Sequence, residues 1–133
     1  MENLIINEID VLKRLDNLDI HKSPGPDRIH SRILYEVPNE IKNALKIIFN
    51  NSLQSHQVPL DWRAGNITPI FKKGSKTNAS NYRPISLTSI VCKLFESIIR
   101  DHIVQYFIVT NLFISKQYGF TKGRSTVLQL LKI

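Results

Sequence analysis

Four cationic side chains lie close together in the sequence, at Lys72, Lys73, Lys76 and Arg83. An arginine guanidinium can hold two phosphate oxygens at once, and a lysine ammonium adds a point charge beside it. The three lysines fall in a Gly/Ser/Asn/Thr-rich stretch between two segments rich in β-forming residues. The pattern predicts a β-hairpin with a basic tip that could close over a triphosphate or follow a nucleic-acid strand. On charge alone, a solvated lysine-rich loop is the simpler alternative.

Carboxylate pairs of the kind that hold metal ions in polymerases and nucleases are missing from the second half of the sequence. After Asp61 the acids are Glu96 and Asp101. Five positions along a helix correspond to ~140° of rotation, so these two acids do not face one site. Cys92 is the single cysteine, which excludes a cysteine-rich zinc site. No metal centre is expected, and none of the four histidines has ligand spacing: His21, His30, His56 and His102.

The stretch Gly119–Thr126 superficially resembles a phosphate-binding P-loop. It has three residues between its glycines instead of four, and Arg124 stands where the motif has lysine. The serine-hydrolase motif G-x-S-x-G is absent as well. An ATPase and a serine hydrolase are therefore excluded.

The elements that must position the basic hairpin are mainly helices. Apolar residues at helical spacing predict an amphipathic helix over 5–19, a short one over Ser31–Glu36, and a third that begins at Pro38 and ends before Val58. Strands are expected at Asn66–Phe71 and Tyr82–Leu87. Thr88 or Ser89 would cap a long helix that reaches Phe107.

Turn signals separate these elements. Pro24, Gly25 and Pro26 set a tight turn within Lys22–Asp27. Near the end, Gln117–Phe120 is expected to form a short strand or turn, and Ser125 would cap a helix over Thr126–Ile133. Because that helix has no stop signal, we expect the sequence to be part of a longer protein.

Charge is unevenly distributed along the 133 residues, whose formal net charge is +7. Residues 1–61 hold 7 basic and 9 acidic side chains, a net charge of −2, whereas residues 62–133 hold 11 and 2, a net charge of +9. A stretch of one sign attracts polyanions such as nucleic acids. The apolar runs are too short for a membrane span, and no secretion signal is visible, so we expect no membrane partner and an intracellular, nuclear or cytoplasmic location.

Several blocks in a fixed order resemble the reverse transcriptases of non-LTR retrotransposons, and the chain looks most like the jockey-type, LINE-like elements. The most specific are Tyr-Arg-Pro-Ile-Ser-Leu and Gln-Tyr-Gly-Phe-x-x-Gly-Arg-Ser-Thr. The similarity runs from about residue 5 to the end of the chain. The matching blocks are Lys22–Asp27, Pro59 with Trp62, Ile67–Gly74, Asn81–Thr88, Lys93 with Phe95-Glu96, and Gln117–Phe120 with Gly123–Thr126.

The resemblance implies an α+β, mostly helical fold: the fingers subdomain of a right-hand polymerase, with a small antiparallel β-hairpin and an incomplete palm. Residues 1–61 would form the N-terminal extension and the helical start of the fingers. Residues 62–133 would form the fingers hairpin, the long helix and the lead-in to the palm.

The resemblance also implies roles for single residues. Lys72 and Arg83 match the lysine and arginine that hold the triphosphate of the incoming nucleotide. A second group is expected near the nucleotide or the template, and consists of Lys73, Gln117, Gly119, Phe120 and Arg124. A third group is expected to contact template RNA, and consists of Lys22, Ser23, Gly25 and Arg28.

The implied function is that of a fragment of an RNA-directed DNA polymerase. Its partners would be template RNA, a DNA primer and a dNTP, with Mg²⁺ as the cofactor of the full-length enzyme. The metal-binding aspartates of the palm, the thumb and the endonuclease domain are absent from this sequence, so we expect the fragment to be inactive alone and to bind no metal. Two alternatives stay open: a non-catalytic nucleic-acid-binding remnant of a truncated element, and a decayed reading frame without a biochemical role.

Overall fold

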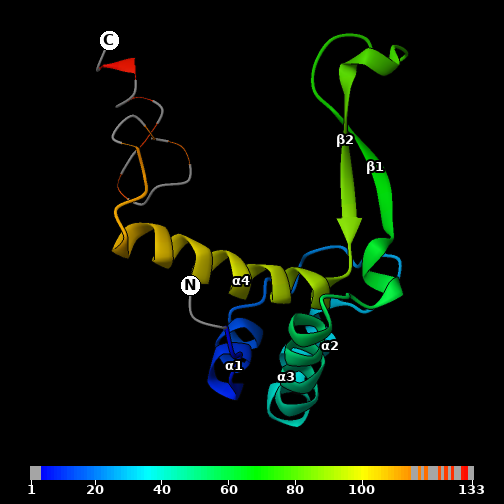
Figure 1. Cartoon of the computed structure of the whole chain (residues 1–133). Helices are drawn as coiled ribbons and strands as arrows, with labels where there is room; N and C mark the ends of the chain where they lie inside the picture. The colour runs from blue at the N-terminus through cyan, green and yellow to red at the C-terminus, as the bar shows by residue number, and fades with distance from the viewer. Residues whose placement is uncertain are drawn as a thin grey trace. The chain divides into compact units, whose positions relative to one another are not determined.

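The computed structural model describes residues 4–114 and positions 117, 119, 123, 125, 127, 130 and 131. Its helices are α1 (Glu8–Asp16), α2 (Ser31–Glu36), α3 (Pro38–Ser55) and α4 (Ile90–Val109), and its strands are β1 (Gly65–Phe71) and β2 (Tyr82–Thr88) (Figure 1). Single 3-10 turns lie at Leu60–Arg63 and Ala79–Asn81. The predicted α+β architecture, mostly helical with one antiparallel hairpin, is confirmed for these residues.

The chain divides into two compact units, Glu2–Arg100 and the residues from Asp101 onward. The first unit contains α1 to α3, the hairpin and the first half of α4. In the second unit, the rings of Phe107 and Phe113 pack edge to face at 5.5 Å. The predicted turn at Gln117–Phe120 and the predicted helix over Thr126–Ile133 lie mostly outside the described residues.

The first helix is shorter than the apolar pattern predicts, since α1 begins at Glu8 and ends at Asp16 instead of covering 5–19. Asn7 stops it at the N-terminal end, because its side-chain oxygen accepts the Asp10 N–H at 2.8 Å and caps the helix. Ile6 is therefore outside the helix although it is buried, with 1% of its surface exposed. Helical periodicity therefore indicates neither where this helix begins nor which of its residues are buried, since Ile9 is 63% exposed whereas Val11 is fully buried.

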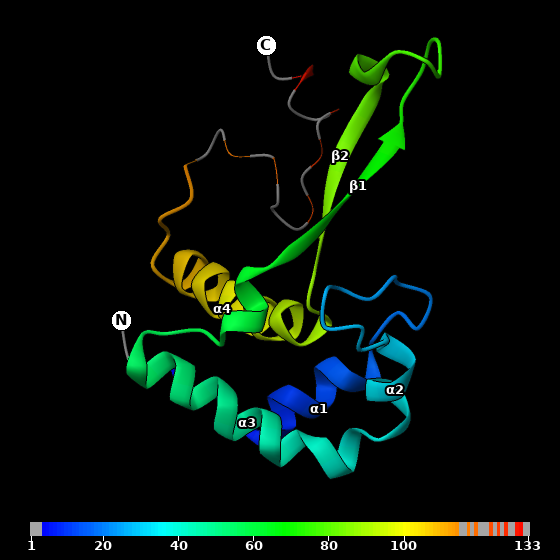
Figure 2. The same ribbon diagram turned by 90° about the vertical axis from the view of Figure 1, so that its right-hand side faces the viewer.

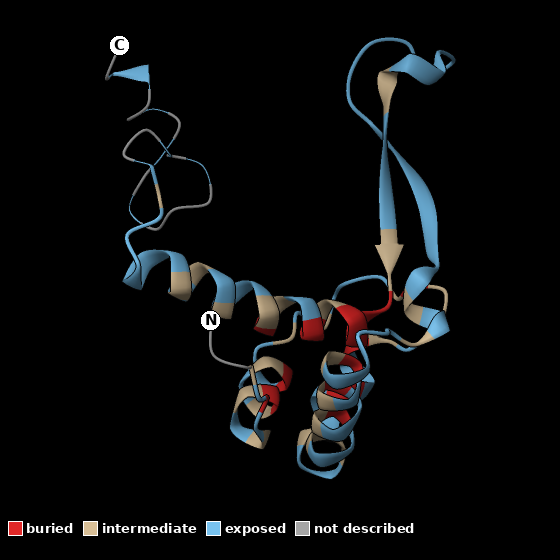
Figure 3. Cartoon of the chain, viewed as in Figure 1, coloured by how far each residue is buried: buried red, intermediate tan, exposed pale blue. Residues whose placement is uncertain are grey.

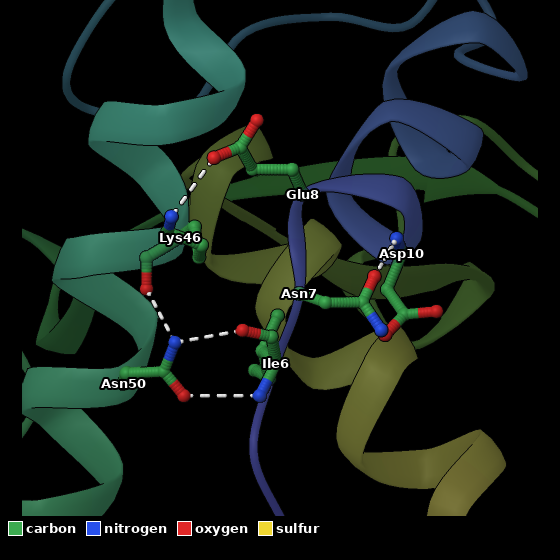
Figure 4. Close-up of polar contacts among 6 residues, drawn as sticks. All are labelled: Ile6, Asn7, Glu8, Asp10, Lys46 and Asn50. Carbon is green, nitrogen blue, oxygen red and sulfur yellow. Dashed lines mark hydrogen bonds and ion pairs between the residues drawn. The ribbon is translucent and has the colours of Figure 1, made fainter.

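Asn50 of α3 fixes the segment before α1 (Figure 4). Its amide oxygen accepts the Ile6 N–H at 3.0 Å, and its amide nitrogen donates to the carbonyl oxygens of Ile6 at 2.8 Å and Lys46 at 2.9 Å. One turn away, Lys46 Nζ lies 2.9 Å from Glu8 Oε1. The hydrogen bond and the charge of Lys46 lower the pKa of the Glu8 carboxyl. These contacts hold α1 against α3.

The core of the first unit is built from α1, α2, α3 and the start of α4 (Figure 3). At its centre the rings of Phe49 and Phe95 stack with their centroids 5.0 Å apart. The ring of Trp62 packs beside them, with its centroid 5.6 Å from that of Phe95. The helix α4 begins where Ser89 caps it, because the Ser89 hydroxyl accepts the Cys92 N–H at 3.4 Å. This confirms the predicted helix start. The remaining buried members of the core are Ile6, Val11, Leu15, Leu34, Leu45, Ile90, Val91, Leu94 and Ile98.

Candidate nucleic-acid interface

The two strands form an antiparallel hairpin whose register places Ile70 opposite Arg83 and Phe71 opposite Tyr82. The ladder continues one step beyond β1, because the Lys72 N–H donates to the Asn81 carbonyl oxygen at 2.8 Å. Side chains alternate between the two faces of a strand, and residues opposite one another share a face. Lys72, Ile70 and Arg83 therefore belong to one face of the hairpin.

This face is open to solvent. Every residue of β1 is exposed, and β2 is exposed from Arg83 to Ser86. Figure 3 shows most of the hairpin in the colour of exposed residues. Lys72 and Arg83, the two residues predicted to bind the triphosphate, are thus brought together on one accessible surface.

The tip of the hairpin is held by its own hydrogen bonds. Asn81 Nδ2 donates to the Ser75 carbonyl oxygen at 2.9 Å, and the Tyr82 hydroxyl donates to the Lys76 carbonyl oxygen at 2.9 Å. Gly74 has a φ of 89°, and a Cβ there would lie 2.6 Å from Asn81 Nδ2. A residue other than glycine would disturb both the backbone and this bond. The tip therefore has a defined shape, which restrains the backbone that carries Lys72.

The opposite face of the hairpin is aromatic. The rings of Phe71 and Tyr82 meet edge to face at 5.5 Å, and Lys76 Nζ lies 5.9 Å from the centre of the Phe71 ring. A lysine over an aromatic face gains a modest cation–π attraction. Lys76 therefore lies on the face of the hairpin opposite to that of Lys72 and Arg83. The positions of the charges in the sequence do not distinguish these lysines. Lys73 is exposed at the start of the tip.

The predicted template loop packs against the base of this hairpin. Gly25 is buried, and a Cβ at this position would lie 2.6 Å from the backbone of Thr88 and Ser89. In contrast, Lys22 and Ser23 are exposed. Gly25 is one of the residues that the sequence predicts to contact RNA. The structure gives it a packing role that joins the loop to the junction of β2 and α4.

Arg28 ends the same loop in an unusual backbone conformation. Its φ is 57°, and its N–H donates to the Gly25 carbonyl oxygen at 3.1 Å, which closes a turn. The Asp27 carboxylate accepts the Ile29 N–H at 3.2 Å and supports the next residue. The Arg28 side chain is exposed. Lys22, Ser23 and Arg28 are therefore available to a ligand on the outside of the loop.

The remaining predicted contacts lie in the second unit. Gln117 Nε2 donates to the Gly119 carbonyl oxygen at 2.8 Å, so these two residues are joined by a local bond. Phe120 and Arg124 lie outside the described residues. Asn81 is not among the site residues predicted from the sequence, although its amide holds the tip. The sequence signal that could have identified Asn81 is its position next to Tyr82 in the matching block Asn81–Thr88.

Carboxylates do not gather in the part of the chain that the structure describes. No group of three or more His, Cys, Asp or Glu side chains there could hold a metal ion. These residues therefore do not fit the Mg²⁺ ions expected for a whole polymerase. Within the same part of the chain, every helix is too short or too polar to cross a membrane.

Proteins of known identity match nearly the whole chain, although no family model matches it. Over 125 residues, 93% of this chain, it is 30% identical to the probable RNA-directed DNA polymerase from transposon BS of Drosophila melanogaster. It is 31% identical over the same length to the probable RNA-directed DNA polymerase from transposon X-element, and 29% to the RNA-directed DNA polymerase from mobile element jockey, both of that fly.

The chain spans only 13–14% of the length of these curated relatives. It is therefore homologous to a segment of RNA-directed DNA polymerases from mobile elements. These relationships confirm the resemblance to the reverse transcriptases of jockey-type elements.

Proposed function

We propose that this chain is the fingers and the N-terminal extension of an RNA-directed DNA polymerase, and that its hairpin binds the triphosphate of the incoming nucleotide. The observation that carries the proposal is the placement of Lys72 and Arg83 on one exposed face of the hairpin. The homologous polymerases supply the reaction class. In this division, residues 1–61 form the extension and the start of the fingers, and residues 62–133 form the hairpin, the long helix and the approach to the palm.

The proposed chemistry is phosphoryl transfer at the α-phosphate of a dNTP: the 3′-hydroxyl of a DNA primer on template RNA attacks this phosphorus, the bond to the β-phosphate breaks, and pyrophosphate leaves. The triphosphate is highly charged, and catalysis of such transfers depends on positioning and on fixed positive charge. Arg83 can hold two phosphate oxygens, and the Lys72 ammonium neutralises a third. The ligands for Mg²⁺ would come from the remainder of the polymerase, because the described residues of this chain contain no group of three or more His, Cys, Asp or Glu side chains that could hold a metal ion.

The other predicted contacts complete the proposal. Lys22, Ser23 and Arg28 would contact template RNA from the outside of the loop, while Gly25 holds that loop in position. Lys73, Gln117 and Gly119, with Phe120 and Arg124 beyond the described residues, are assigned to the neighbourhood of the template and nucleotide. We place the protein inside the cell, in the nucleus or cytoplasm.

Kinetics of the full-length polymerase test the nucleotide site. Changing Lys72→Ala or Arg83→Ala should lower kcat/KM for dNTP by about 10²–10³-fold, because a fixed charge on the transferring phosphates is removed. Lys76→Ala is the matched control, since this lysine lies by Phe71 on the other face. It removes the same charge from the same loop and should change kcat/KM by less than about threefold. Equal losses in all three variants would contradict the assignment.

We propose that the chain by itself is inactive, because no group of His, Cys, Asp or Glu side chains in its described part could hold the catalytic metal ions. A primer-extension assay on an RNA template with the isolated 133-residue chain should give no product. Extension by that chain would overturn this part of the proposal.

A further inference from the structure

Both strands of the hairpin are edge strands. Within the described part of the chain the sheet consists of β1 and β2, which Figure 2 shows side by side. The outer edge of each strand therefore has no strand beside it. An open edge presents backbone N–H and C=O groups that can pair with a strand of another molecule.

The side chains of the hairpin favour such pairing. Ile67 is 72% exposed, Ile70 48% and Ile85 36%. Isoleucine is among the strongest strand formers, because its branched side chain packs well on a pleated surface. An exposed edge strand with apolar side chains is a site of association unless some feature of the edge prevents it.

The register determines which backbone groups point outward. The Lys72 N–H donates to the Asn81 carbonyl oxygen, so these two residues form a hydrogen-bonded pair. Hydrogen-bonded and non-hydrogen-bonded pairs alternate along an antiparallel ladder. Three steps from this pair, Pro69 lies opposite Pro84. The two prolines therefore form a non-hydrogen-bonded pair, in which each backbone nitrogen points away from the other strand.

A proline thus lies at the outer edge of each strand, where an added strand would have to pair. Proline has no N–H, and its ring occupies the place from which a hydrogen would be donated. Both Pro69 and Pro84 are exposed. Within the hairpin neither proline costs a ladder bond, because neither nitrogen faces the partner strand.

We propose that Pro69 and Pro84 close the two edges of the hairpin against strand addition by a second copy of this chain. The ends of the edges are protected in other ways. At the base, the loop between α1 and α2 lies against β2, since a Cβ at Gly25 would be 2.6 Å from the Thr88 carbonyl oxygen. At the tip, β1 is followed by lysines, which disfavour strand addition.

This role is independent of the proposed function, because it rests on the register and the exposure of the hairpin alone. Its consequence is that both faces of the hairpin stay accessible, whichever ligand they bind.

Sedimentation velocity of the 133-residue chain over a range of concentrations tests the proposal. Pro69→Val gives the outer edge of β1 an N–H, and Pro84→Val does the same for β2. Each single variant should form dimers at concentrations about tenfold or more below those at which the wild-type chain associates, because a hydrogen bond is gained and a ring is removed. Association of both variants no stronger than that of the wild-type chain would overturn the proposal.

The size of the assemblies is a sharper test. In each single variant the newly opened edge pairs with its own copy across a two-fold axis, and the other edge stays closed, so association should stop at the dimer. The double variant Pro69→Val/Pro84→Val has two open edges in each copy and should form larger, open-ended species. A double variant that stops at the dimer would contradict independent closure of the two edges.

The matched control is the double variant Thr68→Val/Ser86→Val. It places two valines in the same strands, next to Pro69 and two positions from Pro84, without adding an N–H to either edge. Its association should equal that of the wild-type chain. If it associates as strongly as the proline variants, the apolar surface and not the missing donors governs association, and the proposal is wrong.

Hydrogen exchange locates the contact. In the Pro69→Val dimer, the outward N–H groups of Ile67 and Phe71 should exchange about tenfold more slowly than in the dilute monomer, because they are paired. Dimers without this protection would place the contact elsewhere and overturn the assignment.

The wild-type chain supplies a test that does not depend on the folding of any variant. A peptide copy of residues 65–71 that carries Pro69→Val should not slow exchange of the Ile67, Phe71 or Ser86 N–H groups when it is added in excess. Slower exchange at these groups would show that the wild-type edges accept a strand, which would overturn the proposal.

Discussion

At the scale of single residues, the hairpin shows how register selects among similar cations. Lys72, Lys73 and Lys76 carry the same charge within five positions of sequence. Pairing of Ile70 with Arg83 assigns Lys72 to the arginine's face, while Lys76 lies by the Phe71 ring on the other. Successive side chains of a strand point to opposite faces, so a one-residue slip of register would move Arg83 to the face of Phe71 and away from Lys72.

Cys92 is a residue whose reactivity the fold suppresses. It is 7% exposed, and burial together with the nearby Glu96 carboxylate raises the pKa of its thiol to about 11. The thiolate is the reactive form, so reaction with a thiol reagent at pH 8 should be about 100-fold slower in the folded chain than in denaturant. Because Cys92 is the single cysteine of the chain, the measured labelling rate belongs to this thiol alone.

The same pKa fixes the sign of a pH effect. The folded state holds the Cys92 proton more tightly than the unfolded state, so this contribution to stability is complete below about pH 8.5 and is lost as pH rises through about 11. Equal labelling rates in the folded and unfolded chain at pH 8 would contradict the burial of this thiol.

At the scale of elements, α3 ends at a residue that is strained in its position. His56 follows Ser55 with φ 55° and ψ 28°, the left-handed conformation that favours glycine. His56→Gly should raise the free energy of unfolding by about 0.5–1 kcal/mol, because the strain on a side-chain-bearing residue is removed. Urea denaturation measures the change. His56→Ala keeps the strained Cβ and should give no gain, so stabilisation by both variants would point to another cause.

Element boundaries also show what apolar periodicity omits. The strands and α3 lie within one or two residues of the predicted ranges, because proline at Pro38 and the turn residues mark their ends. α1 does not follow its apolar pattern, since Asn7 caps it and Asn50 binds the Ile6 backbone from a distant helix. Such a long-range bond has no local sequence signal.

At the scale of the whole Glu2–Arg100 unit, Gly25 joins the loop between α1 and α2 to the base of the hairpin. Gly25→Ala would place a Cβ 2.6 Å from the backbone of Thr88 and Ser89, which cannot give way like a flexible side chain. We expect a loss of about 1–3 kcal/mol in the free energy of unfolding. Under the proposed function, a polymerase carrying this change should also bind template RNA more weakly, because Lys22 and Arg28 lose their placement.

Gly65→Ala is the matched control for this substitution. A Cβ at Gly65 would meet its nearest neighbour, Thr88 Cγ2, at 3.5 Å, an ordinary contact distance. Its free energy of unfolding should change by less than about 0.5 kcal/mol. Chemical denaturation of the two variants side by side would refute the packing role of Gly25 if both lost the same stability.

The sequence by itself determined the family resemblance, the fold class, most element ranges and the cationic residues of the hairpin. These follow from local signals: periodicity, turn chemistry, charge and ordered motifs. Only the tertiary structure decided that Gly25 packs against the base of the hairpin, and that Asn50 binds the backbone of Ile6. Such contacts join residues far apart along the chain, and they exist only once the helices have packed around a common core.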